Sequence, residues 1–166
     1  SYRKVENDID FDFKPYLKEI KRISKAQVIF GADYIIDIDT INTGSLSIWD
    51  KRLTESADKM FGSCFETIWF YPKKKRKFYR VKWAGIFGTE KEPERKRLHP
   101  TQKPQILLSK ILNDTTEKGE LVYDPFMGCG STALACRNLG VDYIGSEISK
   151  EYCDIAEQRL GQGVLL

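Results

Sequence analysis

The chain has 166 residues, 41% of them hydrophobic, which is enough for one folded domain with its own core. Its 27 basic and 24 acidic residues leave a net charge of +3, too small an excess to indicate a nucleic-acid-binding protein by itself. None of the four cysteines belongs to a C-x-x-C pair and there is one histidine, so we expect no metal site. Free thiols, and the lack of an apolar run long enough to span a membrane, favour a reducing cytoplasm and no membrane partner.

The first half of the chain reads as a loop, a helix and several short strands. Residues 1–12 are polar without a clear period and predict a loop. Pro15 suits the first turn of a helix, which Leu17 and Ile20 continue at helical spacing. Runs of β-branched and aromatic residues predict strands at 27–30, 46–49, 65–70 and 78–83. Residues 84–103 carry glycines and prolines among many charges and predict a long irregular connection.

The second half alternates between helices and strands. The pattern predicts helices at 104–114, 131–140 and 149–160, and strands at 120–124 and 142–147. This order is typical of a parallel α/β unit, so we expect an α/β fold and a single domain over residues 1–166.

The stretch YDPFMGCGST, from Tyr123 to Thr132, joins a strand to a helix through a glycine-rich turn. Gly128 and Gly130 allow the backbone to approach a ligand closely, and the helix that follows presents unpaired N–H groups. Glu147 ends the next strand, where a carboxylate can accept both ribose hydroxyls of an adenosine. This arrangement is typical of a nucleotide-binding site.

The ligand is not expected to be a dinucleotide. Ala133 stands where the G-x-G-x-x-G pattern has its third glycine, although alanine is tolerated there. Asp124 argues more strongly, because its carboxylate would repel a pyrophosphate and hold an ammonium group. A ligand with adenine, ribose and an ammonium but no phosphate is S-adenosylmethionine. A glycine-rich turn without any ligand is the alternative.

These motifs resemble those of the DNA amino-methyltransferases, which modify exocyclic amines of DNA bases. DPFMGCGST is similar to their F-x-G-x-G cofactor motif, and HPTQKP (His99–Pro104) resembles the segment that precedes it in the permuted β-type group. YIGSEIS is similar to their ribose-binding strand, and VIFGADY and SIWDKR to strands of phage and plasmid-like DNA adenine methyltransferases. The likeness covers roughly residues 14–160.

The resemblance implies a Rossmann-like methyltransferase fold that uses S-adenosylmethionine. The implied activity is site-specific methylation of double-stranded DNA, with adenine N6 favoured over cytosine, in a restriction–modification system of a bacterial or phage-infected cell. A catalytically silent DNA-binding or partner subunit is the alternative, and methylation of a small molecule or protein a third.

The resemblance also assigns cofactor-binding roles. Lys103 suits the methionine carboxylate on charge grounds, although it could be a solvated loop charge. His99 could equally be a turn residue fixed by Pro100. The cofactor-binding residues that we predict are His99, Thr101, Lys103, Asp124, Phe126, Gly128, Gly130, Thr132 and Glu147.

The catalytic residues are not found in this chain. In this family a D-P-P-Y or S-P-P-Y loop accepts hydrogen bonds from the target amine, and the aromatic residue of the loop stacks on the flipped base. No such tetrapeptide occurs, and DIDT (residues 37–40) lacks both prolines and the aromatic. We therefore expect the catalytic strand upstream of Ser1, beside the strand that ends at Asp124, and the fold of this chain to be incomplete. An upstream peptide, a second polypeptide or a degenerate relative without chemistry would each account for this.

A basic run lies between two aromatic stretches in YPKKKRKFYRVKW, residues 71–83. It predicts a phosphate-contacting hairpin, part of a DNA-contacting insert over residues 71–98, with a solvated turn as the alternative. Lys51 and Arg52, at the end of a strand, are further candidates. The DNA-binding residues that we predict are Lys51, Arg52, Lys73, Lys74, Lys75, Arg76, Lys77 and Arg80.

Overall fold

The computed structural model describes residues 12–52, 54, 63–83 and 98–161 of the chain. They fall into two compact units, one up to residue 83 and one from residue 98 onward. The loop expected at residues 1–12 and most of the connection expected at 84–103 lie outside the described residues. None of the helices in the described part combines the length and apolar character needed to cross a membrane.

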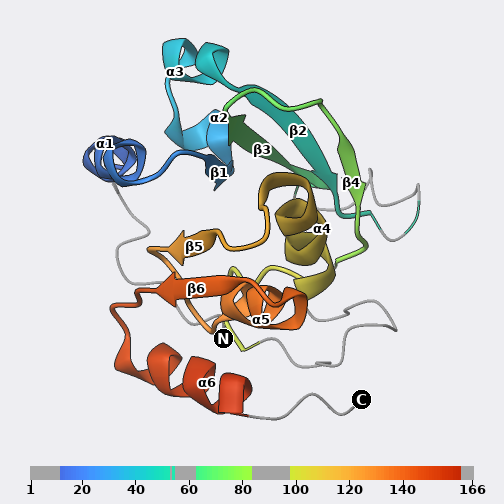
Figure 1. Ribbon diagram of the computed structural model, residues 1–166. Helices are drawn as coiled ribbons and strands as arrows, with labels where there is room; N and C mark the ends of the chain where they lie inside the picture. Colours follow the sequence, from blue (N-terminus) through green and yellow to red (C-terminus); the bar gives the residue numbers. More distant parts are fainter. Residues whose placement is uncertain (1–11, 53, 55–62, 84–97, 162–166) are drawn as a thin grey trace. The chain divides into compact units, whose positions relative to one another are not determined.

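The first unit contains a four-stranded sheet with three helices (Figure 1). β3 lies between β1 and β2 and runs antiparallel to both, and β4 lies outside β2 and parallel to it. The elements are α1 (Lys14–Ile23), β1 (Gln27–Phe30), α2 (Ala32–Ile35), α3 (Ile38–Thr43), β2 (Ser45–Asp50), β3 (Phe65–Tyr71) and β4 (Phe78–Arg80). The predicted helix and four strands are confirmed, whereas the short helices α2 and α3 were not predicted.

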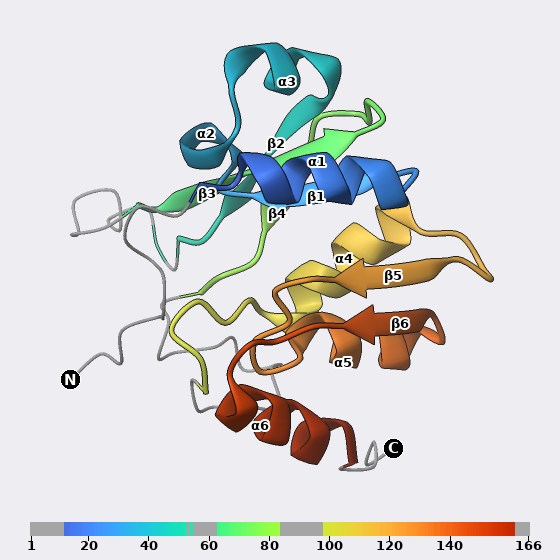
Figure 2. The same cartoon turned by 90° about the vertical axis from the view of Figure 1, so that its left-hand side faces the viewer.

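One face of this sheet packs against the helices. α1 lies across that face, as Figure 2 shows, and buries Leu17 in a cluster with Ile29 of β1 and Trp69 of β3. Ile29 and Trp69 are direct cross-strand neighbours. The indole N–H of Trp69 donates to the carbonyl oxygen of Ile41 at 3.1 Å, so this buried side chain also satisfies its polar atom.

The predicted hairpin over the basic run is wrong in its topology. β3 and β4 do not pair with each other, because β2 lies between them. Residues 72–77 are instead a crossover that passes the beginning of β2 and leads into β4, which starts opposite Ile48. Beyond Arg80 the chain still follows β2, since Trp83 N donates to Lys51 O at 3.0 Å.

The second unit is the expected parallel α/β arrangement. β5 (Leu121–Asp124) and β6 (Asp142–Gly145) lie side by side and point the same way, joined through α5 (Ser131–Leu139) (Figure 1). α4 (Gln105–Thr115) precedes them and packs against α5, and α6 (Lys150–Gly161) follows. All five predicted elements are confirmed, with α5 ending at Gly140 in the left-handed conformation that favours glycine.

The β5–β6 pair leaves apolar surface exposed. Leu121, Tyr123 and Ile144 lie on one face and are 58%, 42% and 53% exposed. β5 pairs with β6 on one side, and no strand among the described residues pairs with its other side. Parallel strands are normally covered on both faces, so an uncovered face next to an unpaired edge is unusual.

Candidate functional site

The turn between β5 and α5 has the backbone that its glycines predict. Gly128 and Gly130 have φ angles of 52° and 80°, in the left-handed region that side chains with a Cβ rarely adopt. Asp124 Oδ1 accepts a hydrogen bond from Phe126 N at 3.0 Å, which fixes the carboxylate at the start of the turn. Gly130 N donates to Met127 O at 3.0 Å and leads into the first turn of α5.

The end of β6 is bonded to this turn. Ser146 N donates to Asp124 O and Met127 N donates to Ser146 O, each at 2.9 Å. The Glu147 carboxylate accepts Gly128 N at 2.8 Å on one oxygen and Ser149 N at 2.9 Å on the other. The structure therefore brings Asp124, Gly128 and Glu147 together, as the spacing in the sequence predicts. Each carboxylate oxygen of Glu147 keeps a second lone pair for a hydroxyl.

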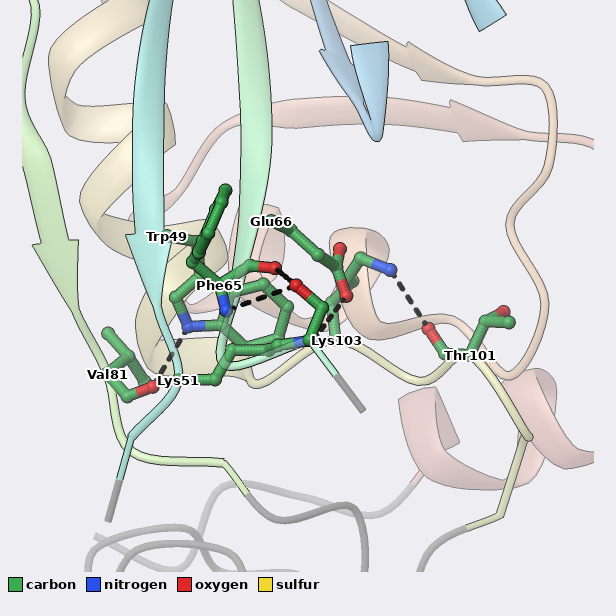
Figure 3. A network of polar contacts seen from close by, with 8 residues as sticks. Trp49, Lys51, Phe65, Glu66, Val81, Thr101 and Lys103 are labelled. Carbon is green, nitrogen blue, oxygen red and sulfur yellow. Dashed lines mark hydrogen bonds and ion pairs between the residues drawn. The ribbon is translucent and has the colours of Figure 1, made fainter. Parts of the chain in front are cut away.

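The HPTQKP segment lies at the same turn. A Cβ added to Gly128 would lie 3.4 Å from Cδ2 of His99. The imidazole also packs edge-on against the ring of Tyr152 on α6, with 4.2 Å between ring centroids. Thr101 contacts His99 Nδ1 with its N and Oγ1, at 3.2 and 3.1 Å. Lys103 Nζ donates to Thr101 O at 3.4 Å, as Figure 3 shows.

Three residues at this site were missed by the sequence analysis. Tyr152 packs against His99. Met127 packs over Gly145 so closely that a Cβ on residue 145 would clash with the Met127 sulfur. The buried Arg159 donates to the carbonyl oxygen of Cys129. A glycine inside a strand is a known signal of such close packing. Arg159 gave no signal, because an arginine near the end of a helix usually faces solvent.

The electrostatics of the turn suit a cation better than a phosphate. Burial, and then the charge of Asp124, raises the pKa of the Cys136 thiol on α5 to about 11. Independently of that thiol, Asp124 is held at the start of the turn by Phe126 N, where its negative charge would repel a pyrophosphate and attract an ammonium group. The carboxylates of Asp124 and Glu147 fit an ammonium and ribose hydroxyls, which are groups that S-adenosylmethionine carries.

The two candidate DNA-binding residues that directly follow β2 are held in local ion pairs. Lys51 Nζ lies 3.2 Å from Glu66 Oε1, and the indole N–H of the buried Trp49 donates to Val81 O at 2.9 Å (Figure 3). Arg52 binds the carboxylate of Asp50 at 2.8 Å and lowers the pKa of that carboxyl below its ordinary value. Whether either residue contacts DNA stays a prediction, but each already has an anionic partner.

The basic crossover differs from these residues in its exposure. The side chains of Lys73, Lys74, Lys75, Arg76 and Lys77 are all exposed. Arg80 is exposed as well, with its guanidinium 5.3 Å from the centre of the Phe78 ring.

Comparisons with known proteins agree on one family. Residues 79–158 match the model of a family described as DNA methylase. The type II methyltransferase M.HinfI of Haemophilus influenzae is 32% identical over 180 residues, covering 87% of this chain and 49% of the relative. M2.DpnII of Streptococcus pneumoniae, another type II methyltransferase, is 41% identical over 78 residues, covering 47% of this chain and 29% of the relative. The chain thus spans about half of M.HinfI and less of the other.

Solved structures show the same fold. The crystal structure of an M1.HpyAVI–SAM complex is similar with a TM-score of 0.63 and 27% identity, covering 95% of this chain and 85% of that chain. The cytosine-N4-specific PvuII DNA methyltransferase reaches a TM-score of 0.58 at 16% identity, covering 99% of this chain and 77% of that chain. At that identity the likeness supports the fold alone.

Proposed function

We propose that this chain belongs to the DNA methylase family, whose model matches residues 79–158, and that the protein containing it transfers a methyl group from S-adenosylmethionine to an exocyclic amine of a DNA base. The observation that carries the proposal is the anionic turn after β5, where Asp124 and Glu147 flank two glycines in the left-handed conformation. Adenine N6 is the favoured target, on the resemblance of the strands around residues 28–34 and 47–52.

Each residue at the turn has a role in this proposal. S-adenosylmethionine supplies a methyl group that its sulfonium makes electrophilic. Asp124 holds the ammonium group, Glu147 the ribose hydroxyls, and Lys103 with Thr101 the carboxylate. The half-exposed Phe126 and the glycine backbone line the adenine and methionine parts, and His99 supports the turn from the side of Gly128.

The base-binding loop comes from a further polypeptide segment, either of the same protein or of a second one. Three observations support this part of the proposal. The face carrying Leu121, Tyr123 and Ile144 is exposed, and β5 has an edge that no strand in the described part of the chain pairs with. M.HinfI is about twice as long as the part that this chain matches. A strand added along β5 would bring a loop to the same edge of the sheet as Asp124.

The substrate is double-stranded DNA, and the setting is a restriction–modification system. The type II names of M.HinfI and M2.DpnII support the setting.

Calorimetry and methyl transfer test the proposal on the full-length protein. We expect S-adenosylhomocysteine to bind, labelled methyl groups to pass from S-adenosylmethionine to duplex DNA, and Asp124→Ala to lose both. Asp142→Ala is the matched control, because it removes an exposed carboxylate at the start of β6 and should leave both unchanged. Binding of a diphosphate coenzyme in place of S-adenosylhomocysteine would overturn the proposal.

Nucleoside analysis of the methylated DNA by mass spectrometry identifies the target. N6-methyladenine is the expected product, and N4-methylcytosine would correct the base while keeping the reaction class. A full-length protein that binds S-adenosylhomocysteine and DNA yet transfers no methyl group to any DNA would instead be the silent partner subunit.

A further inference from the structure

The crossover between β3 and β4 is held against the sheet by its backbone. Lys74 N donates to Ser45 Oγ and Lys77 N donates to Ser47 Oγ, both at 3.0 Å. Ile48 N donates in turn to Lys77 O at 3.0 Å, which starts the parallel pairing of β2 with β4. Five of the six residues from 72 to 77 are Lys or Arg, so a strongly charged segment has a fixed path.

Ser45 and Ser47 are unusual residues for their positions. Both are buried, on the face of β2 that also buries Trp49, where a large apolar side chain would be expected. A buried hydroxyl needs a hydrogen-bond partner, and here the partners are amides of the crossover. The two serines therefore fix the backbone while leaving the basic side chains toward solvent.

Four of the five basic side chains on the crossover have no anionic partner in the described part of the chain. Within the described part of the chain, the side chains of Lys73, Lys74, Lys75 and Arg76 take part in no ion pair. Residues 71–83 contain no acidic residue at all. Like charges held close together repel each other, and a polyanion would relieve this repulsion.

Aromatic surface continues the patch into β4. Phe78 is 63% exposed, and the guanidinium of Arg80 lies 5.3 Å from its ring centre. An exposed aromatic ring stacked with arginine beside a basic run is typical of surfaces that contact nucleic acids.

We infer that residues 72–77, with Phe78 and Arg80, form a preformed contact surface for the phosphate backbone of duplex DNA, and that Ser45 and Ser47 are the positioning residues that hold it. The inference rests on the proposed function, which identifies the polyanion as DNA. It adds the surface of the protein to which the duplex binds. The competing explanation is that lysines protect β4, an outer strand of its sheet, from pairing with other sheets. That role would affect solubility and not DNA affinity.

Salt dependence of DNA binding separates the two explanations. The charge variant replaces Lys73, Lys74, Lys75 and Arg76 with Gln in the full-length protein. The control replaces four exposed lysines on other segments, namely Lys18, Lys25, Lys110 and Lys118, with Gln and so removes the same charge. The probe is a fluorescein-labelled duplex of mixed sequence, titrated in about 50–200 mM potassium chloride.

We expect the slope of log affinity against log salt to become less steep by roughly 3 to 4 in the charge variant, or about 0.9 per lost phosphate contact. The control should keep most of the wild-type slope, and both should bind S-adenosylhomocysteine as the wild type does. If the charge variant fails to fold, Lys73→Gln with Lys75→Gln is the smaller change, with an expected loss of about 2 in the slope. A charge variant with the slope of the control would overturn the inference.

Amide hydrogen exchange tests the positioning role. Ser45→Ala should speed exchange at Lys74 and lower DNA affinity by roughly twofold to tenfold, since one hydrogen bond is lost. The salt slope should stay at the wild-type value, because no charge is removed. Ser45→Thr keeps the hydroxyl and should restore slow exchange. Unchanged exchange in Ser45→Ala would refute the positioning role.

The wild-type protein reports separately on the proposed function. If the wild-type protein transfers methyl groups to DNA but the charge variant has the same salt slope as the four-lysine control, the inferred contact surface is wrong. The proposed function then stands. If the wild-type protein neither methylates nor binds the duplex, the proposed function fails, and the inference fails with it.

Discussion

At the scale of single residues, Gly130 combines two constraints that can be measured apart. Its φ of 80° disfavours any side chain, and an added Cβ would lie 3.0 Å from the Cβ of Ala156 on α6. We expect Gly130→Ala to lower the free energy of unfolding by about 1–2 kcal/mol for the backbone strain and by about 1–3 kcal/mol more for the crowding. Affinity for S-adenosylhomocysteine should fall as well, because the turn shifts.

Gly140 supplies the control for this prediction. It also has a left-handed φ, of 66°, but an added Cβ would meet no atom within 4 Å. Gly140→Ala should therefore show the strain alone and keep cofactor affinity. Adding Ala156→Gly to Gly130→Ala should recover the part of the unfolding free energy that is lost to crowding against Ala156. Urea unfolding and calorimetry measure both quantities, and equal losses in the two alanine variants would contradict the close approach of α6.

The buried thiol of Cys136 makes stability depend on pH. Burial first, and the charge of Asp124 second, raises its pKa from 9.0 to about 11. Between these values the thiol ionises in the unfolded chain while it stays protonated in the folded one. This contribution is therefore complete below pH 9.0 and is lost as pH rises toward about 11. Urea unfolding across this window should show a steeper fall for the wild type than for Cys136→Ala, and parallel profiles would contradict the prediction.

At the scale of elements, α3 depends on its cap. Asp37 accepts a hydrogen bond from Thr40 N at 2.7 Å, and this bond lowers the pKa of the carboxyl below 3.8. Asp37→Ala should destabilise the chain, whereas Asp37→Asn, which can still cap, should do so less. Asp39→Ala removes the same charge from the same helix without removing the cap. Thermal unfolding compares the three, and equal effects of both alanine variants would show that charge and not capping matters. Because the pKa of Asp37 in the folded chain is lowered, the stabilisation from the cap is complete above pH 3.8. It is lost as pH falls from there through the lowered pKa of the folded chain.

The same helix shows why sequence reasoning found some elements and missed others. Strands rich in Val, Ile and Trp and helices bounded by Pro or Gly follow local rules, so β1 to β3, α1, α4 and α5 could be predicted. α2 and α3 are short and have little apolar period, although Asp37 followed by Thr40 was a readable cap signal. Strand order is not a local property, which is why the sequence predicts a hairpin where the structure has a crossover.

The candidate site divides in the same way. Asp124, Gly128 and Glu147 follow from the strand–turn–helix pattern, because the ends of adjacent parallel strands must meet. Tyr152 and Arg159 reach the turn from α6, and their contact depends on how that helix packs. No spacing rule within the motif could place them.

At the scale of the whole molecule, charged substitutions on the uncovered face of β5 and β6 should have opposite effects in two settings. They should benefit the 166-residue chain alone and harm the full-length protein. Leu121→Lys with Ile144→Lys replaces exposed apolar side chains by charged ones. In the 166-residue chain alone this should raise solubility, because the apolar patch is lost. In the full-length protein, or with its partner polypeptide, the same change should destabilise the fold and reduce methyl transfer, since buried lysines lack partners.

Gln158→Lys on α6 is the control, since it adds a charge at an exposed position outside this face and should be neutral in both proteins. Sedimentation of the 166-residue chain, together with unfolding and methyl transfer of the full-length protein, measures the outcome. A full-length protein that tolerates both lysines would mean that this face stays open to water. The base-binding segment would then have to pair with the edge of β5 without covering the face of the sheet. In that case the backbone amides of Leu121–Asp124 should exchange slowly in the full-length protein, and amide hydrogen exchange would locate the segment.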